Sequence, residues 1–329
     1  MLWAFDDFSH PTRLYPFLVG GDKSSPEHVR GGKTGALRIG ISGWRYKPWR
    51  GVFYPPGLPQ RKELSFAAET FNSIEINGTF YCLQQPESFA RWAAETPDDF
   101  VFAVKGSRYI THMLRLKNIK MALANFFASG LLRLGRKLGP ILWQFPANFQ
   151  FDRERLEEFF EMLPRDSASA ASLARRCDKR IITKPSISVK SEIILRYAME
   201  IRHQSFAVPE FIKLLRKNNV ALVCADTVDW PRLMDLTSNF IYCRLHGSEE
   251  LYVSGYDDQS IDDWAKRVAA WVRGREPADA ERVIAQDAPK RRKRDVFVYF
   301  DNDAKVRAPF DAQKLRSRVM ALLTADCAS

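Results

Sequence analysis

Two glutamates stand in short apolar runs of this sequence, where a buried strand would ordinarily carry Val or Ile. Glu75 lies in SIEINGTFY (73–81) and Glu200 in MEIRHQSF (199–206). Two carboxyl groups in different surroundings can be held in opposite protonation states, which suits general acid and general base catalysis. We therefore take Glu75 and Glu200 as an acid/base pair.

Three further residues are candidates for catalysis. His203 follows Glu200 closely and His246 follows the apolar run 239–245, and imidazole exchanges protons near neutral pH. Asp226 ends the run ALVCAD. These side chains complete the set of catalytic candidates.

The substrate implied by the remaining side chains is anionic. Lys105, Arg202 and Arg244 supply positive charge, and guanidinium groups match the geometry of phosphate and carboxylate. The other candidates for substrate contact are polar or aromatic: Trp44, Asn77, Tyr81, His112, Gln144, Asn302 and Asp303.

The positions of these residues depend on the alternation of side chains along a strand. Ile74 and Ile76 project to one face of their strand, so Glu75 and Asn77 share the other. The same rule, applied to eight apolar runs, predicts one polar face at the C-terminal ends of the strands: Ser42, Trp44, Glu75, Asn77, Lys105, Gln144, Glu200, Arg202, Asp226, Arg244, His246, Asp301 and Asp303.

The order of these runs predicts the fold. Strands are expected over 37–42, 73–77, 100–106, 140–146, 194–202, 221–226, 239–247 and 295–303. Helical spacing separates them at 63–71, 86–96, 121–138, 152–164, 208–219, 260–272 and 310–323. This alternation predicts an α/β protein with the TIM (β/α)8 barrel fold, in which the sixth helix is degenerate because 227–238 is too short. The sequence contains neither GxGxxG after the first strand nor a P-loop.

The domain organisation follows from the same segments. Residues 1–36 are expected to form an N-terminal extension, and residues 37–329 a single barrel domain with basic, loop-like insertions at about 165–192 and 273–295. These insertions carry seven of the eleven net positive charges. The cluster KRRKR (290–294) could bind nucleic acid, although runs of charge are commonly just solvated.

Other compositional features point to a folded cytoplasmic protein. Hydrophobic residues make up 46% of the 329 residues, and no apolar run is long enough to cross a membrane. The N-terminal residues lack the pattern of a signal peptide. The five cysteines are scattered, as expected for reduced thiols, and do not have the spacing of a zinc site.

Seven motifs, in order, resemble those of the YecE-like family of TIM-barrel proteins of unknown function: IGISGWRYKPWRGVFYP, SIEINGTFY, KGSRYITH, LGPILWQFP, MEIRHQSF, YCRLHG and VYFDND. The resemblance covers residues 37–323 and implies the barrel fold and a shared pocket, but no reaction. The family-like residues are Gly43, Trp44, Glu75, Asn77, Thr79, Phe80, Tyr81, Lys105, Thr111, His112, Gln144, Glu200, Arg202, His203, Asp226, Arg244, His246, Gly247, Asn302 and Asp303. Asp301 departs from the family, which more often has Asn there.

Three functions are compatible with these residues. The first is a hydrolase or isomerase acting on a sugar-like or phosphorylated anionic small molecule. The second is a nucleic-acid-binding or nucleic-acid-processing barrel that uses the basic insertions. The third is a non-catalytic binder of a small anion. A divalent metal is a possible cofactor, with Glu75, Glu200, Asp226, His246 and Asp301 as ligands, although three cations compete at the same place.

Overall fold

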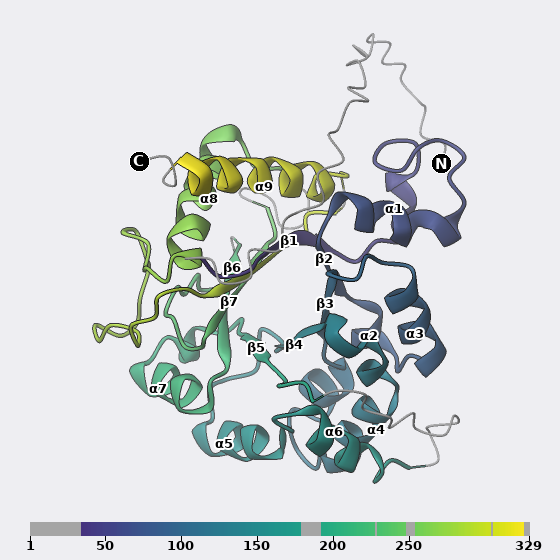
Figure 1. The fold of residues 1–329 in the computed structure, drawn as a ribbon. Helices are drawn as coiled ribbons and strands as arrows, with labels where there is room; N and C mark the ends of the chain where they lie inside the picture. The colour runs from purple at the N-terminus through teal and green to yellow at the C-terminus, as the bar shows by residue number, and fades with distance from the viewer. Residues whose placement is uncertain (1–33, 179–191, 228, 248–253, 304, 326–329) are drawn as a thin grey trace, which may run out of the picture. The chain divides into compact units, whose positions relative to one another are not determined.

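The computed structural model describes residues 34–178, 192–227, 229–247, 254–303 and 305–325. In these residues eight parallel strands form a closed barrel in chain order, and the last strand pairs with the first. The predicted TIM (β/α)8 fold is confirmed (Figure 1). The strands are β1 (Leu37–Ser42), β2 (Ser73–Ile76), β3 (Val101–Lys105), β4 (Leu138–Gln144), β5 (Tyr197–Glu200), β6 (Ala221–Asp226), β7 (Phe240–Leu245) and β8 (Asp295–Phe300).

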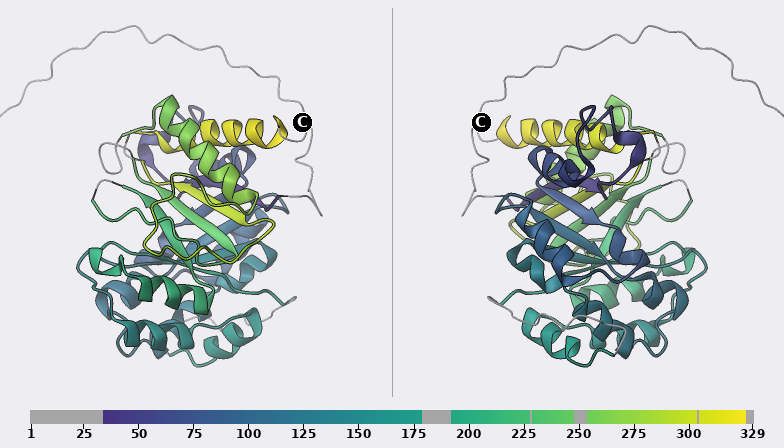
Figure 2. Two further views of the ribbon diagram at one scale, coloured as in Figure 1. Left: turned by 90° about the vertical axis from the view of Figure 1, so that its left-hand side faces the viewer. Right: turned by 90° about the vertical axis from the view of Figure 1, so that its right-hand side faces the viewer.

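Helices surround the strands, as the side views in Figure 2 also show. Each of the seven helical segments predicted from periodicity contains a helix of the structure. The α-helices are α1 (Glu63–Thr70), α2 (Gly78–Tyr81), α3 (Pro86–Ala94), α4 (Lys120–Ala128), α5 (Arg153–Met162), α6 (Ser167–Ala174), α7 (Pro209–Asn218), α8 (Asp258–Val272) and α9 (Ala308–Ala325). Short 3-10 turns are η1 (Lys47–Trp49), η2 (Gln60–Lys62), η4 (Leu131–Lys137) and η5 (Gln204–Phe206), and η3 (Tyr109–Met113) is a π-helical turn.

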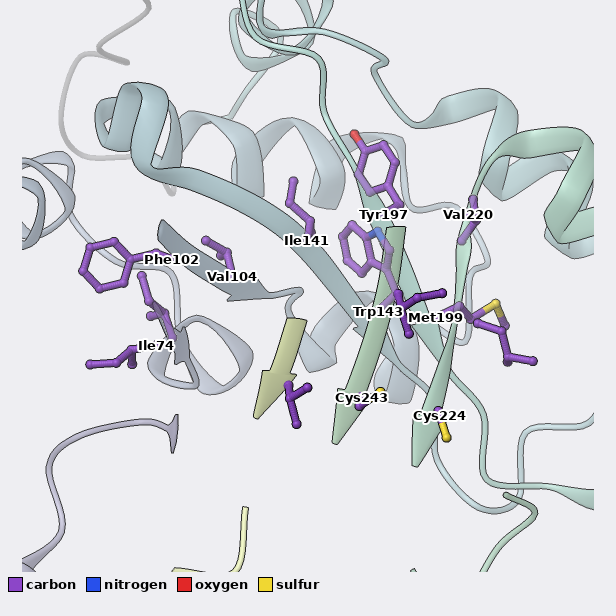
Figure 3. Close-up of a cluster of buried hydrophobic side chains, with 14 of the residues drawn as sticks. Ile74, Phe102, Val104, Ile141, Trp143, Tyr197, Met199, Val220, Cys224 and Cys243 are labelled. Atoms are coloured by element: carbon purple, nitrogen blue, oxygen red, sulfur yellow. The ribbon is translucent and has the colours of Figure 1, made fainter. Parts of the chain in front are cut away.

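Two buried layers separate the inside of the barrel from its outside. Outward side chains of the strands pack against the helices, and Figure 3 shows part of this layer, including Ile141 and Trp143 of β4 and Met199 of β5. A smaller inner cluster fills the barrel at its N-terminal end and includes Tyr242 and Tyr299. The barrel interior is therefore a packed core, as is typical of this fold.

The first two strands approach closely at a glycine. A Cβ at Gly40 would lie 1.8 Å from the backbone oxygen of Ser73 on β2. No side chain fits at that distance, so glycine allows β1 and β2 to pair.

Two segments differ from the sequence prediction, and a third agrees with it. The predicted helix over 121–138 is interrupted at Gly130, which adopts φ 110°, so α4 is followed by the separate turn η4. The expected loop at 165–192 instead begins with α6, because Asp166 and Ser169 form a capping box and alanine favours helix. The described residues between β6 and β7 contain no helix, as predicted.

Parts of the sequence predictions lie outside the described residues. Most of the N-terminal extension (1–33) and residues 179–191 of the first basic segment belong to this group. Within the described part of the chain, no helix is both long and apolar enough to cross a bilayer. A cytoplasmic location stays a prediction.

Candidate functional site

A fully buried guanidinium lies at the centre of the barrel near the C-terminal ends of the strands. Arg244 on β7 donates to Glu75 on β2 (Nη2–Oε1 3.0 Å) and to Glu200 on β5 (Nη1–Oε2 2.8 Å). Its Nη2 also contacts Asp301, just after β8, at 2.7 Å. We call these four residues the Arg244 cluster. Its ion pairs connect β7 with β2, with β5 and with the end of β8.

The two glutamates of the cluster have no accessible surface and several donors each. Glu75 accepts from the hydroxyl groups of Ser42 and Tyr242, both at 2.5 Å. Glu200 accepts from Nε2 of Gln144 at 2.7 Å and from Nε of Arg202 at 2.9 Å. The sequence correctly predicts that the two carboxylates converge. Because hydrogen bonds and the ion pairs with Arg244 already occupy both carboxylates, we assign them a structural role beneath the site.

The charge of Arg244 lowers the pKa of two carboxyl groups, those of Glu200 and Asp301. Burial alone would raise the pKa of Glu200, but the charges of Arg244 and Arg202 outweigh burial and hold that pKa well below its ordinary value. The pKa of Asp301 is likewise lowered, because Arg244 and then His246 outweigh burial. Both carboxyl groups are therefore ionised at neutral pH.

A cavity of about 700 Å³ opens above the Arg244 cluster at the barrel mouth. We call it the mouth cavity. Its lining contains the sequence-predicted contacts Asn77, Tyr81, Lys105, His112, Gln144, Arg202 and Asp303, together with Tyr46, Phe80, Arg108, Met113 and Asp301. Glu75, Glu200 and Arg244 do not belong to this lining and lie beneath it.

Lys105 ends β3 and brings an ammonium group to the mouth cavity. The residue is 7% exposed, and Nζ lies 4.5 Å from the ring centroid of Phe80. Burial and then the charge of Arg244 lower the pKa of Lys105 to about 8. In the part of the chain that the structure describes, its Nζ forms neither a hydrogen bond nor an ion pair.

Two arginines add positive charge to the same lining. Arg108 lies over the ring of Tyr81, 5.6 Å from its centroid, and forms no ion pair with any described residue. Arg202 pairs with Glu200 and lies 4.1 Å from the ring centroid of Trp230. The aromatic rings hold both guanidinium groups in place at the cavity wall.

Asp303 and His112 are two residues of the cavity lining whose pKa values are shifted. Burial and the negative charge of Asp301 raise the pKa of Asp303 well above its ordinary value, so its neutral acid form is favoured. Burial and the charge of Arg202 lower the pKa of His112 to about 4, so this imidazole is neutral at pH 7. One group can donate a proton and the other can accept one.

Two residues predicted to face the mouth lie outside the barrel. The inner face of β6 carries Ala221, Val223 and Ala225, so Asp226 points outward and accepts from Nε1 of Trp264 on α8 at 3.2 Å. Trp44 packs edge-on against Trp92 of α3, with ring centroids 5.4 Å apart.

The predictions for Asp226 and Trp44 as mouth residues are therefore wrong. Because both faces of β6 are apolar, the sequence does not indicate whether Asp226 points into the barrel or out of it. Gly43 adopts φ 85°, which ends the alternation of β1 at Ser42.

Three other predicted site residues also have local partners. His203 caps the turn η5, where its Nδ1 lies 2.9 Å from Oγ of Ser205. Asn302 donates to Asp311 of α9 at 2.9 Å, and it therefore faces away from the mouth cavity. His246 is buried with Nδ1 3.2 Å from Oδ2 of Asp301 and lies beside the Arg244 cluster.

The sequence prediction omitted several residues of the mouth. Arg108 lies in KGSRYITH but beyond the end of β3, where strand alternation no longer applies. The π-helical turn η3 brings Met113 and His112 back to the cavity. Trp230, which contacts the wall residue Arg202 without lining the cavity itself, comes from the segment after β6, which carries no periodic signal. The short spacing from Lys105 to Arg108 is the one signal that could have identified Arg108.

The proposed metal ligands do not assemble into one set. Asp226 lies outside the barrel, and the carboxylates of Glu75, Glu200 and Asp301 are all paired with Arg244. Among the described residues, no group of three or more His, Cys, Asp or Glu side chains is arranged to hold a metal ion.

Comparisons with known proteins agree with this architecture. The family model described as "Protein of unknown function DUF72" matches residues 38–326. YecE of Escherichia coli strain K12 is 31% identical over 129 residues, which are 39% of this chain and 44% of the relative. YunF of Bacillus subtilis strain 168 is 28% identical over 125 residues, covering 36% and 43% of the two chains. The alignments thus span less than half of these curated relatives.

Two crystal structures of DUF72 family proteins share the fold. The protein from Thermotoga maritima MSB8 has a TM-score of 0.67 at 23% identity, covering 87% of this chain and 99% of that one. The protein from Enterococcus faecalis V583 has a TM-score of 0.59 at 17% identity, covering 89% and 99%. At these identities the likeness shows the barrel fold alone.

Proposed function

The chain belongs to the DUF72 family, whose function is unknown, and from its mouth cavity we propose that it is an enzyme acting on a small anionic molecule. The reaction class we propose is hydrolysis or isomerisation of a sugar-like or phosphorylated compound. The observation that carries the proposal is the pair Lys105 and Arg108, two cations of the cavity lining that form no ion pair with any described residue.

The size and charge of the mouth cavity support binding of such a molecule. A volume of about 700 Å³ lies within the usual range for small-molecule sites. Arg202 and Asp301 are paired with residues of the Arg244 cluster, and Asp303 favours its neutral form. Lys105 and Arg108 therefore leave the lining with excess positive charge.

We assign the roles of acid and base to residues of the cavity lining and not to the buried glutamates. Glu75 and Glu200 hold Arg244 and do not reach the cavity. Asp303 as the acid and His112 as the base line it, with protonation states shifted in opposite directions. Such a difference is the pattern expected of a catalytic pair.

Binding of inorganic phosphate tests the proposal directly. We expect the double substitution Lys105→Gln and Arg108→Gln to weaken phosphate binding by roughly tenfold or more, measured by calorimetry, because two cations of the cavity lining are lost. The matched control is Lys213→Gln with Arg136→Gln, which removes two exposed cations away from the mouth. Equal affinities in both variants would contradict the proposal.

A screen of sugar phosphates and oxo acids by thermal shift then separates an enzyme from a binder. A bound compound that is converted identifies an enzyme, and Asp303→Asn is expected to lower its turnover more than its affinity. A compound that binds but is never converted favours the non-catalytic alternative.

A second candidate function has one observation in its favour. Residues 290–293 are four consecutive exposed cations, a pattern suited to the phosphates of nucleic acid. The fifth residue of KRRKR, Arg294, is buried and donates to the carbonyl groups of Gly274 and Pro289. The segment enters β8 at its N-terminal end, opposite the mouth. Nucleic acid bound there would not reach the mouth cavity, so the two functions are separable.

A further inference from the structure

We propose that Lys105 is a nucleophilic lysine that forms an imine with an aldehyde or ketone carrying an anionic group. The inference rests on the proposed function, because it places the anionic substrate in the same mouth cavity. It also narrows the substrate class from anions in general to anionic carbonyl compounds.

The surroundings of Lys105 differ from those of a lysine with a structural role. Lys137 shows the structural case, since its Nζ donates to the carbonyl groups of Ala93 and Thr96 at 2.6 and 2.7 Å. Lys105 has no such acceptor among the described residues, and its amine lies beside the face of Phe80 at the cavity. A buried amine without acceptors is open to a ligand.

The charges around Lys105 favour a reactive, unprotonated amine. Burial comes first and the guanidinium of Arg244 second in lowering its pKa to about 8, while Glu75, Asp301 and Glu200 oppose them. About a tenth of such an amine is unprotonated at pH 7, compared with far less than a hundredth of an ordinary lysine. Desolvation and a neighbouring cation are the two known means of activating a lysine for imine formation.

The neighbouring residues supply the other requirements of the reaction. The lone pair of Nζ attacks the carbonyl carbon, and the electron pair of the C=O π bond moves to the oxygen. The proton that the nitrogen then loses is transferred to this oxygen, which becomes a hydroxyl group. Asp303 protonates that hydroxyl, which leaves as water while the nitrogen forms the C=N bond. Arg108 and Arg202 hold the anionic group of the substrate.

The product of this step indicates the reaction class. A protonated imine withdraws electrons from the adjacent carbon and makes its C–H bond acidic. The neutral imidazole of His112 lines the same cavity and can accept that proton. Imine formation therefore favours an isomerase over a hydrolase.

Reductive trapping with glyoxylate tests the inference on the full chain. Glyoxylate joins an aldehyde to a carboxylate, and cyanoborohydride converts its imine to a stable amine that peptide mass spectrometry locates. At pH 7.5 we expect labelling of Lys105 to exceed that of any other lysine by roughly tenfold or more, because of its larger unprotonated fraction. The initial rate at Lys105 should rise up to about pH 8 and then level off, whereas ordinary lysines continue to gain rate to about pH 10.

Two variants and one competitor make the result decisive. Lys105→Arg should abolish the preferential label, and Lys213→Arg, which changes an exposed lysine of α7, should leave it intact. Inorganic phosphate should slow labelling of Lys105. Labelling of Lys105 that is no faster than that of exposed lysines overturns the inference even if one of the variants fails to fold, because it is measured on the native sequence.

The two proposals fail in distinguishable ways. Phosphate binding that depends on Lys105 and Arg108, without preferential trapping, leaves the anion site standing and overturns the imine. Preferential trapping that phosphate does not slow supports the nucleophile and contradicts the anion site.

Discussion

Arg244 is a guanidinium without solvent contact that is paired with three carboxylates. A buried charge is costly unless its partners are present, and removal of one partner from a buried pair typically costs about 3–5 kcal/mol. The cluster is thus a condition for folding of the barrel mouth more than a source of net stability.

The first prediction concerns this residue. Arg244→Met should lower the free energy of unfolding by about 3–5 kcal/mol or prevent folding, because three carboxylates lose their common cation. Arg153→Met is the control, since Arg153 is exposed and, among the described residues, its side chain pairs with Glu157 alone; the cost of this change should stay below about 1 kcal/mol. Urea denaturation measures both, and similar losses would refute a special role for Arg244.

The second prediction is the response of stability to acid. Glu200 has a pKa in the folded protein well below its ordinary value of 4.5. A carboxylate of this kind stabilises the fold above its unfolded pKa, and that contribution is lost as pH falls toward the folded value. The urea concentration at the unfolding midpoint should therefore decrease as the pH is lowered below about 4.5. The midpoint of the Glu200→Gln variant should decrease less steeply over the same pH range. An equal slope in the two proteins would contradict a lowered pKa for Glu200.

The third prediction concerns Asp301, the carboxylate of the Arg244 cluster that also lines the mouth cavity. Asp301 raises the pKa of Lys105 through its negative charge. Asp301→Asn removes this charge, so the pKa of Lys105 should fall below about 8. At about pH 6, where Lys105 stays largely protonated, inorganic phosphate should bind more tightly because a negative charge beside the site is lost. The pH profile of glyoxylate trapping and calorimetry measure the two effects. An upward shift of the profile would be incompatible with the arrangement described.

At the scale of elements, α6 shows how local signals form a helix inside a basic segment. The carboxylate of Asp166 accepts from the backbone N–H of Ser169 at 2.7 Å, and the hydroxyl of Ser169 accepts from the backbone N–H of Asp166 at 3.2 Å. Ala170, Ala171 and Ala174 are buried. The helix is thus fixed by its N-cap and by a face of small residues.

The fourth prediction tests that cap. Asp166→Ala should destabilise the protein by about 1 kcal/mol, because one acceptor for the first turn of α6 is lost. Glu161→Ala, at an exposed position near the end of α5, is the control and should stay within about 0.5 kcal/mol of the parent. Thermal unfolding distinguishes the two, and a control loss equal to that of Asp166→Ala would rule out the capping explanation.

The elements were predictable from sequence where periodicity was strong. The strands around Glu75 and Arg244 alternate clearly, so their convergence at the mouth could be inferred. Asp226 could not be placed, because β6 is apolar on both faces and alternation then loses its meaning. Trp44 and Arg108 lie beyond strand ends, where a glycine turn or a π-helical turn determines direction and period two does not apply.

At the scale of the whole barrel, two groups of cations lie at opposite ends of the strands. The mouth cavity lies at the C-terminal ends of the strands, and residues 273–294 connect α8 to the N-terminal end of β8. A strand of this length separates the two by roughly 20 Å. That distance exceeds the Debye length of about 8 Å at physiological salt.

The fifth prediction follows from this separation. Replacement of residues 290–293 by glutamines should leave phosphate affinity and trapping of Lys105 unchanged at physiological salt, because screening isolates the mouth from these charges. The same variant should lose any salt-dependent binding of nucleic acid, measured by fluorescence anisotropy. A weakened phosphate site would show that the basic segment acts on the mouth after all.

The Arg244 cluster also determines how this barrel can be re-engineered. Arg244, Glu75 and Glu200 come from strands far apart in the chain, so a single substitution at any of these three fully buried residues removes a partner that residues adjacent in sequence cannot replace. Libraries for altered specificity should therefore keep these three positions fixed and diversify wall residues such as Asn77, Tyr81 and Met113, which lie outside the cluster. Changes at Arg244, Glu75 or Glu200 should be recovered only as combined replacements that balance charge.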